Sequence, residues 1–278
     1  MHTKVSTLRR RAVAVSARRG SIVGMCGRYA STLDPETLYG VFEAEPDPIA
    51  PPGSGMYGGD VPRPRYNIAP TDTVAIVRVR PERDDAPAGR FVGEARWGLV
   101  PSWAKDIKVG SRMFNARADS VPTKPAFRNA FERRRALVPA SGYYEWRVIG
   151  TDAKGKPRKQ AFYITPQDGS VMAFAGLWEF WRSPEGEPVV STSIITTDAV
   201  GRMQQIHDRM PLVLPASEWD QWLDPAVAAA DLLPMLAPPD LHLVDALELR
   251  PVGAGVGNVR NDSPDLVVEV TAEEPVAG

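Results

Sequence analysis

Alternating hydrophobic and polar residues run through the middle of the chain and predict a series of β-strands. The segments with this pattern are Val74 to Arg80, Phe91 to Val100, Ala136 to Val138, Tyr143 to Val148, Ala161 to Thr165, Val171 to Trp178 and Val189 to Thr196. A period of two residues is typical of strands with one buried face. Because no long helix separates these strands, the pattern predicts a curved, mostly antiparallel β core, partly barrel-like, rather than a doubly wound parallel sheet.

Helices are predicted at the periphery of this core, which makes the fold class α+β. Asp34-Pro35-Glu36 places a capping residue, a first-turn proline and an early acid before Leu38, and so predicts a short helix. Further helices are expected over Pro125 to Arg134, Ser217 to Leu223 and Pro225 to Leu236, and closing strands over residues 242–250 and 265–270. Residues 44–64 are rich in proline and glycine, which indicates a long irregular loop.

Composition narrows the class of protein. The chain has 278 residues, of which 43% are hydrophobic and 24% charged, as in a soluble globular protein. We expect one domain over residues 26–270, followed by a frayed tail at 271–278. With one cysteine, three histidines and neither an HExxH nor a CxxC pattern, we expect no metal site and no cofactor. No apolar run approaches the length of a membrane span.

Charge is distributed unevenly although the net charge is only −1. Residues 1–25 carry six Lys/Arg and no acid, residues 26–135 carry 17 Lys/Arg against 14 acids, and residues 136–278 carry 10 against 20. The body is therefore acidic, and a polyanion site in it requires a local cluster of arginines. The basic extension over 1–25 suits a start codon assigned too far upstream, a segment that is removed, an organelle transit peptide or a disordered tail. We favour the first of these, in which translation starts at Met25.

Cys26, in the run Met25-Cys26-Gly27-Arg28-Tyr29, is the only cysteine of the chain. If Met25 is removed, Cys26 carries an α-amine and a thiol on adjacent carbons. The reference pKa of an α-amine is about 7.7 to 8.0, so this amine is a far better nucleophile near neutral pH than a lysine. It can form a Schiff base with an aldehyde, and the thiol can then close a thiazolidine ring. An ordinary thiol nucleophile and a small buried core residue are the alternatives.

Three further side chains are candidates for chemistry. Glu145 lies in the aromatic run Gly142-Tyr143-Tyr144-Glu145-Trp146, where loss of water should raise its pKa and suit it to acid/base catalysis. His207 precedes an Asp-Arg pair and a proline, and Asn115 opens the stretch Asn-Ala-Arg-Ala-Asp. Each also has a structural interpretation: a strand-edge glutamate paired to an arginine, a hydrogen-bonded histidine, and an asparagine in a turn.

Arginines and aromatic residues accompany these stretches. They are Arg28, Arg65, Arg112, Arg117 and Arg209, together with Tyr66, Trp97, Trp103 and Trp146. Guanidinium groups suit phosphates and aromatic faces suit unstacked bases, so the combination favours single-stranded nucleic acid over a duplex. Arginines exposed to water and tryptophans buried in the core are the structural alternative, because they would give the same combination of residues.

The order of the motifs resembles a known family. MCGRYA, RYNIAP, WGLVPSW, FNARADS, SGYYEW, IHDRMP and VGNVRN follow one another between Met25 and about Val270. This succession is similar to that of the SRAP family, named as SOS response-associated peptidases. The resemblance implies a compact α+β domain that senses abasic sites in single-stranded DNA, in which a terminal cysteine forms a thiazolidine with the ring-opened sugar. We also expect a monomer in the cytoplasm, associated with the nucleoid, with no membrane partner.

The resemblance also implies roles for individual residues. It makes Cys26 the covalent residue, Asn115 a residue that positions the sugar and the cysteine, Glu145 the acid/base, and His207 an aid to ring opening and reversal. The DNA contacts that it implies are Arg28, Asn67, Pro70, Trp103, Arg117 and Thr196. Many relatives have a second tryptophan directly after the one at Trp103, where this chain has Ala104.

Two competing functions remain open from the sequence. One is a thiol peptidase, which includes cleavage of its own extension, using Cys26 and His207 with Asn115 or Glu145. The other is a nucleic-acid binding module that forms no covalent bond. The 24 residues before Met25 separate these interpretations, because the aminothiol exists only when Cys26 is the amino terminus.

Overall fold

A closed β-barrel forms the centre of the molecule. The computed structural model describes residues 26–47, 64–81 and 88–273. Its larger sheet runs in the order β12-β11-β10-β7-β4-β5-β2, and an additional pairing of β11 with β5 closes five of these strands into a barrel. The strands are β2 (Glu45–Pro46), β4 (Thr73–Arg80), β5 (Gly89–Trp97), β7 (Arg135–Ala140), β10 (Met172–Arg182), β11 (Pro188–Asp198) and β12 (Arg209–Pro211).

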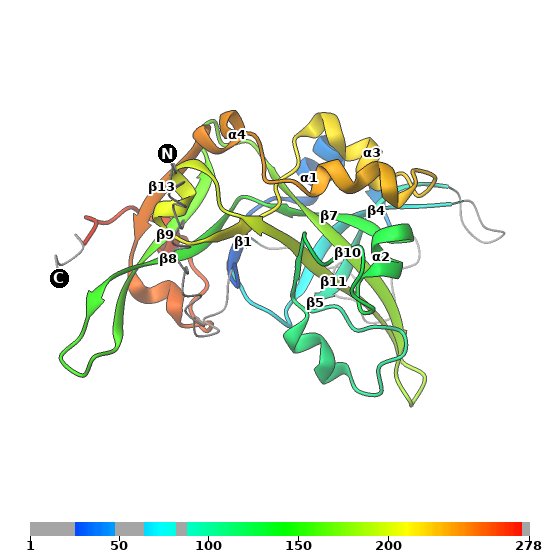
Figure 1. Ribbon diagram of the computed structural model, residues 1–278, viewed down its shortest axis with the longest axis horizontal. Helices are drawn as coiled ribbons and strands as arrows, with labels where there is room; N and C mark the ends of the chain where they lie inside the picture. The colour runs from blue at the N-terminus through cyan, green and yellow to red at the C-terminus, as the bar shows by residue number, and fades with distance from the viewer. Residues whose placement is uncertain (1–25, 48–63, 82–87, 274–278) are drawn as a thin grey trace, which may run out of the picture.

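A second sheet lies beside the barrel, at the left of Figure 1, with strand order β13-β9-β8-β1-β3. Its strands are β1 (Tyr29–Ser31), β3 (Arg65–Ile68), β8 (Gly142–Thr151), β9 (Pro157–Pro166) and β13 (Leu247–Val252). The β8–β9 hairpin extends beyond the body of the molecule (Figure 1). All pairings within this sheet are antiparallel, so together with the barrel they confirm the predicted curved, mostly antiparallel core.

Side-chain alternation divides the core into two main layers. Val77, Leu137 and Leu177 point to the outside of the barrel and pack with the helices. Those helices are α1 (Pro35–Phe42), α2 (Arg128–Arg133), α3 (Trp219–Leu223) and the 3-10 helix η4 (Ala229–Leu236). Their neighbours in sequence, Ile76 and Ala136, point to the inside and pack with residues of the second sheet. Successive residues of a strand face opposite sides, so one strand serves both layers.

Most sequence-predicted elements are confirmed, with three corrections. Residues 241–245 form helix α4 (Leu241–Asp245) rather than the start of a strand, because the Asp240 side chain accepts a hydrogen bond from the His242 amide and caps a helix. Residues 264–267 form the 3-10 helix η6, opened by Pro264, and only Glu269 bridges to Val252. In the segment 225–236, helical structure starts at Ala229.

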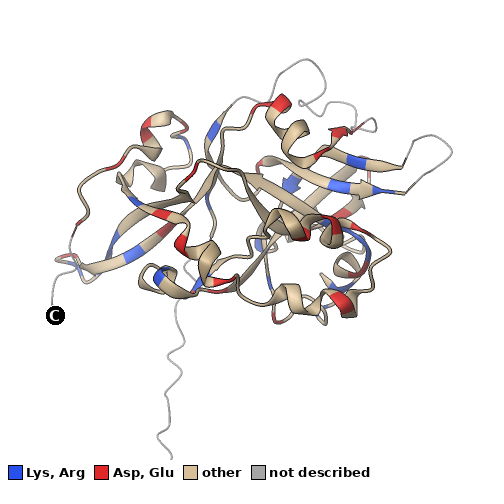
Figure 2. Ribbon diagram, turned by 90° about the horizontal axis from the view of Figure 1, so that it is seen from above, with Lys and Arg blue, Asp and Glu red and all other residues tan. Residues whose placement is uncertain are grey.

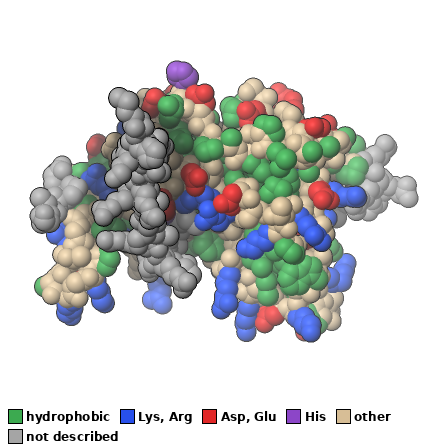
Figure 3. Space-filling view, in the orientation of Figure 1, with side chains coloured by type: hydrophobic (Ala, Val, Ile, Leu, Met, Phe, Trp, Pro, Cys, Tyr) green, Lys and Arg blue, Asp and Glu red, His purple; other side chains and the backbone are tan. Residues whose placement is uncertain are grey.

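The remaining elements are short. They are η1 (Ile107–Arg112), β6 (Asn115–Arg117), η2 (Gly201–Gln205), η3 (Ala216–Glu218) and η5 (Ala254–Gly257). Of the predicted loop over 44–64, residues 48–63 lie outside the described residues, as do the extension 1–25 and residues 274–278. Acidic and basic residues are interspersed over both sheets (Figure 2), while basic side chains follow the lower edge of the face in Figure 3.

Candidate functional site

Cys26 lies three residues before the start of β1, and β1 places it against the start of β8. β1 pairs with both β8 and β3, with Tyr29 opposite Tyr143 and the Tyr144 amide donating to the Arg28 carbonyl over 3.0 Å. Tyr29 packs edge-on against Trp97 of the barrel, which fixes this strand to the core. The register therefore brings Cys26 beside Glu145, 119 residues further along the chain.

One carboxylate oxygen of Glu145 accepts two hydrogen bonds from Cys26. The Cys26 amide nitrogen lies 3.0 Å from Glu145 Oε2, and Cys26 Sγ lies 3.3 Å from the same oxygen. Both residues are buried, with exposed fractions of 4% and 3%. Burial raises the pKa of the Glu145 carboxyl, a shift that the nearby His207 opposes. Burial and the Glu145 charge raise the pKa of the Cys26 thiol well above its usual range, so the thiol keeps its proton at neutral pH.

Burial of Glu145 makes stability depend on pH. Because its pKa is higher in the folded chain, stability is fully present below the unfolded pKa of about 4.3 and is lost as pH rises through the folded pKa. We expect Glu145→Gln, which cannot ionise, to melt at a higher temperature than wild type at pH 8 and by a smaller margin at pH 4. Thermal melts of both proteins across this range measure the difference, and a constant margin would contradict the shift.

β11 brings the other two candidates to the same place from opposite sides. Its last residues pair with β6, which opens with Asn115, on one side and with β12, which follows His207, on the other. Asn115 Nδ2 lies 3.5 Å from the Cys26 carbonyl oxygen. The charge of His207 acts on Glu145, since it lowers the pKa of that carboxyl. The structure thus gathers Cys26, Asn115, Glu145 and His207 at the junction of the two sheets.

His207 has two alternative partners at one ring nitrogen. The Arg209 amide donates to His207 Nδ1 over 3.1 Å, and Asp208 Oδ1 lies 2.8 Å from the same nitrogen. Nδ1 cannot accept a proton from Arg209 and donate one to Asp208 at once. The first contact therefore needs a ring without a proton on Nδ1, and the second needs a ring with a proton on Nδ1. Both contacts hold the ring in the same orientation at the site.

Arg209 is a buried residue of the site, whereas the sequence indicated only one arginine among several. It is 6% exposed and donates to the Thr196 carbonyl over 2.7 Å and to Asp198 Oδ1 over 2.5 Å. Its charge also lowers the pKa of Cys26, in part against the effect of burial. Its position two residues after the histidine and before a proline was the available sequence signal, but burial of that guanidinium depends on tertiary packing.

Arg28 and Asn67 form one hydrogen-bonded unit. Arg28 Nη1 donates to Asn67 Oδ1 over 3.0 Å and to the Val256 carbonyl over 2.7 Å. Asn67 is 1% exposed, and its Nδ2 donates to the carbonyls of Asn258 and Asn261. Partial burial lowers the pKa of Arg28. In this structure Asn67 therefore orients Arg28 and the loop after η5, and its own side chain does not reach the surface.

Removal of the Asn67 amide should cost stability. Asn67→Ala leaves a partly buried guanidinium and several carbonyls without their partner, so we expect the free energy of unfolding to fall by about 1 to 3 kcal/mol. Asn129→Ala, at an exposed asparagine of α2, should change it by less than about 0.5 kcal/mol. Urea titrations measure both, and equal effects would contradict the role of Asn67.

The other predicted DNA contacts differ in exposure. Thr196 is fully buried, and its hydroxyl accepts from Arg209 over 3.3 Å, so it lies behind the surface. Arg117 is exposed and paired with Asp119 at 2.8 Å. Trp103 is 64% exposed, while Pro70 is half-buried. Of these four residues, Arg117, Trp103 and part of Pro70 therefore present surface to a ligand.

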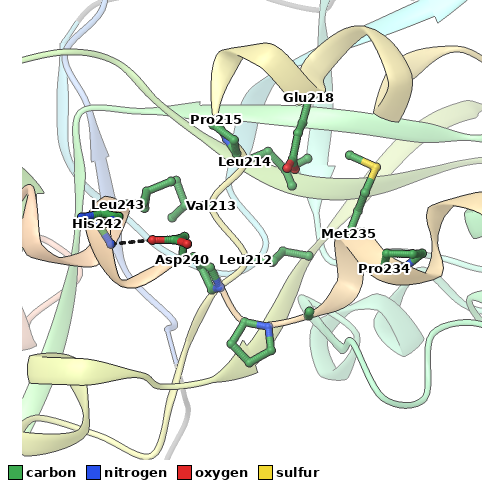
Figure 4. Close-up of a pocket in the computed structure, with 13 residues that line it drawn as sticks. Leu212, Val213, Leu214, Pro215, Glu218, Pro234, Met235, Asp240, His242 and Leu243 are labelled. Carbon is green, nitrogen blue, oxygen red and sulfur yellow. Dashed lines mark hydrogen bonds between the residues drawn. The ribbon is translucent and has the colours of Figure 1, made fainter.

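A second cavity lies apart from this site, and the described residues offer neither a metal site nor a membrane-spanning helix. The cavity of about 350 Å³ drawn in Figure 4 is lined by Leu212, Glu218, Met235 and His242, among others, and contains none of the predicted site residues. Over the described ranges, no group of three His, Cys, Asp or Glu side chains could hold a metal ion. In the same ranges no helix is long and apolar enough to cross a membrane.

Comparison with known families decides the affiliation of the chain. The model of the family described as SOS response associated peptidase (SRAP) matches residues 25–259. The chain belongs to the SRAP family. The match starts one residue before Cys26, so it leaves out residues 1–24.

SRAP relatives cover most of the chain. The abasic site processing protein YoqW of Bacillus subtilis is 35% identical over 243 residues, which cover 87% of this chain and 99% of that protein. The abasic site processing protein HMCES of Rattus norvegicus is 30% identical over 236 residues, covering 73% of this chain and 64% of the relative.

Two solved structures resemble this chain in architecture. A crystal structure of a protein from Bacteroides thetaiotaomicron has a TM-score of 0.71 at 23% identity, and covers 88% of this chain and 100% of its own. A phage-related protein from Bordetella bronchiseptica has a TM-score of 0.58 at 28% identity, over 82% of this chain and 94% of its own. These likenesses agree with the α+β fold.

Proposed function

We propose that this SRAP protein processes abasic sites by forming a covalent thiazolidine between Cys26 and the ring-opened sugar in single-stranded DNA. One observation carries the proposal: the nitrogen and the sulfur of Cys26 both donate hydrogen bonds to the same oxygen of buried Glu145. When Cys26 is the amino terminus, that nitrogen is its α-amine. A single carboxyl group then serves both nucleophiles of the aminothiol. The names of the relatives, abasic site processing proteins, support the choice of substrate.

The reaction balances with one water as the only by-product. The amine attacks the sugar aldehyde and gives a carbinolamine, which loses water to form an imine. The sulfur then attacks the imine carbon and forms the carbon–sulfur bond that closes the ring. The thiol proton leaves through Glu145, and the nitrogen takes up a proton to become a secondary amine. No oxidant or cofactor enters.

Glu145 suits both proton transfers because its pKa is raised. A protonated carboxyl can donate to the departing hydroxyl of the carbinolamine, and the resulting carboxylate can accept the thiol proton at 3.3 Å. Asn115 holds the Cys26 backbone at 3.5 Å, and His207 moves protons during ring opening and reversal. Arg28 and Arg117 bind phosphates, and Trp103 and Pro70 border the DNA path, with Asn67 and Thr196 acting from behind.

The amine requires that residue 25 be removed, and the backbone of Cys26 fits such a change. Its φ of 41° lies in the left-handed region, which side chains other than glycine adopt at a cost. Loss of the preceding residue frees that torsion. We therefore propose that the functional domain starts at Cys26, and that the extension is not translated or is cut away.

A thiol peptidase has weaker support from the same geometry. A peptidase of this class needs a thiolate held by the histidine. Here the Cys26 thiol has a raised pKa and donates to Glu145, and no hydrogen bond within the described part of the chain joins it to His207.

We place the protein in the cytoplasm with the nucleoid as a monomer, with single-stranded DNA carrying abasic sites as its partner.

The decisive experiment identifies the bond. Protein starting at Cys26 is mixed with an oligonucleotide that contains one abasic site, and the adduct is weighed intact. We expect the sum of the two masses less one water. Treatment of the adduct with iodoacetamide should then add no mass at Cys26, because a thiazolidine has no free thiol whereas a Schiff base does. An adduct that takes up one carbamidomethyl group there would contradict ring closure.

A further inference from the structure

The barrel has an open mouth at the end away from Cys26. β7 starts at Arg135, but both of its neighbours continue past this point, β4 to Arg80 and β10 to Arg182. The space that β7 would fill is a groove of about 1050 Å³ between the ends of β4, β10 and α2. These elements lie together at the right of Figure 1, far from β1. Barrel mouths are common ligand sites.

Arginines dominate the charge of this groove. Five line it, namely Arg78, Arg80, Arg133, Arg134 and Arg182, against the two acids Glu132 and Glu179. Three of them are already in ion pairs, Arg78 and Arg80 with Asp47 and Arg134 with Glu179. Arg133 and Arg182 are exposed at the rim, outside every ion pair of the described part. The groove therefore favours an anion through these two rim guanidinium groups.

Aromatic side chains lie among these arginines. Arg78 stacks over Trp178 at 4.5 Å, and it is 6% exposed. Phe180 follows at the rim, 42% exposed, with the Arg182 guanidinium 5.6 Å from its ring. An exposed ring beside exposed guanidinium groups offers a stacking surface and a phosphate site within one side-chain length.

We propose that this groove binds a nucleoside phosphate, with the base against Phe180 and the phosphates on Arg133 and Arg182. The volume suits a ligand of nucleotide size. Guanidinium forks match phosphate oxygens in pairs. The exposed ring favours a base over the carboxylates of an acidic peptide. The ligand is either a free nucleotide or part of a DNA strand, which share this chemistry.

The site is separate from the Cys26 site. Val190 lines the groove and Thr196 lies beside the catalytic candidates, and six residues of one strand span about 20 Å. The proposal therefore does not depend on the crosslinking chemistry. Cys26→Ala should bind nucleotide as wild type does, which keeps a failure of either proposal distinct from a failure of the other.

Calorimetric titration of the full chain with dATP tests the site. We expect dATP to bind more tightly than inorganic tripolyphosphate, and the double variant Arg133→Glu, Arg182→Glu to bind it at least about tenfold more weakly. Phe180→Ala should weaken the binding of dATP but leave the affinity for tripolyphosphate unchanged. Arg128→Glu, which reverses an exposed charge on the same helix outside the groove, is the matched control and should bind as wild type does.

Competition identifies the source of the ligand. The competitor is an intact oligonucleotide of fifteen deoxyadenosines, roughly the longest stretch of single-stranded DNA that one domain covers. If it displaces dATP, the groove binds a DNA strand. If it does not, the groove takes the free nucleotide, and either result supports the site. The proposal is overturned if dATP binds no better than tripolyphosphate, if Arg128→Glu weakens it equally, or if a hexaglutamate peptide displaces it more effectively.

Discussion

Cys26→Ala should abolish the adduct that survives denaturation. Alanine retains the α-amine but lacks the sulfur that closes the ring, so only a reversible Schiff base can form with the abasic aldehyde. We expect wild-type protein starting at Cys26 to shift an abasic oligonucleotide to a band that survives denaturation, and Cys26→Ala to give none. Because Cys26 is small and buried, the variant should fold, which its circular dichroism spectrum checks.

Two matched controls complete this experiment. A chain that keeps residue 25 has the thiol but an amide in place of the amine, so it should also give no band. An oligonucleotide with an intact base should give none with any protein. A stable band from the chain with residue 25 attached would show that the aminothiol is not the reacting group and would overturn the proposed function.

Glu145→Gln should slow crosslinking by about 10² to 10⁴, the usual contribution of a positioned acid/base group. Glutamine keeps the size and the hydrogen-bond acceptor at Cys26, but it can neither donate to the leaving hydroxyl nor accept the thiol proton. Single-turnover rates on an abasic oligonucleotide measure the change. Binding of an intact oligonucleotide should stay the same, which separates chemistry from DNA affinity.

The pH profile distinguishes the groups involved. In wild type the rate should fall towards low pH, as the α-amine with its reference pKa of about 7.7 to 8.0 becomes protonated. The raised pKa of Glu145 adds a second titration on the acid side, which Glu145→Gln should lose. A rate that is flat from pH 5 to 9, or an identical profile in the variant, would contradict these roles.

The sequence alone predicted the candidate site residues more fully than their geometry. Cys26, Glu145, His207 and Asn115 could be chosen because they occur in unusual local runs whose order matches one family. Strand periodicity predicted the barrel strands, since local alternation reflects a buried face. It was wrong at 242–245, where the capping carboxylate of Asp240 outweighs the strand-like pattern that follows.

Tertiary structure alone decided how these residues are placed. The carboxylate of Glu145 meets both atoms of Cys26 only because β1 inserts between β3 and β8, and the β1–β8 pairing joins segments over 100 residues apart. Burial then sets the pKa of both groups, and no local pattern encodes burial quantitatively. Likewise Asn67 and Thr196, predicted to touch DNA, lie behind Arg28 and Arg209, because long-range packing determines which polar side chains reach the surface.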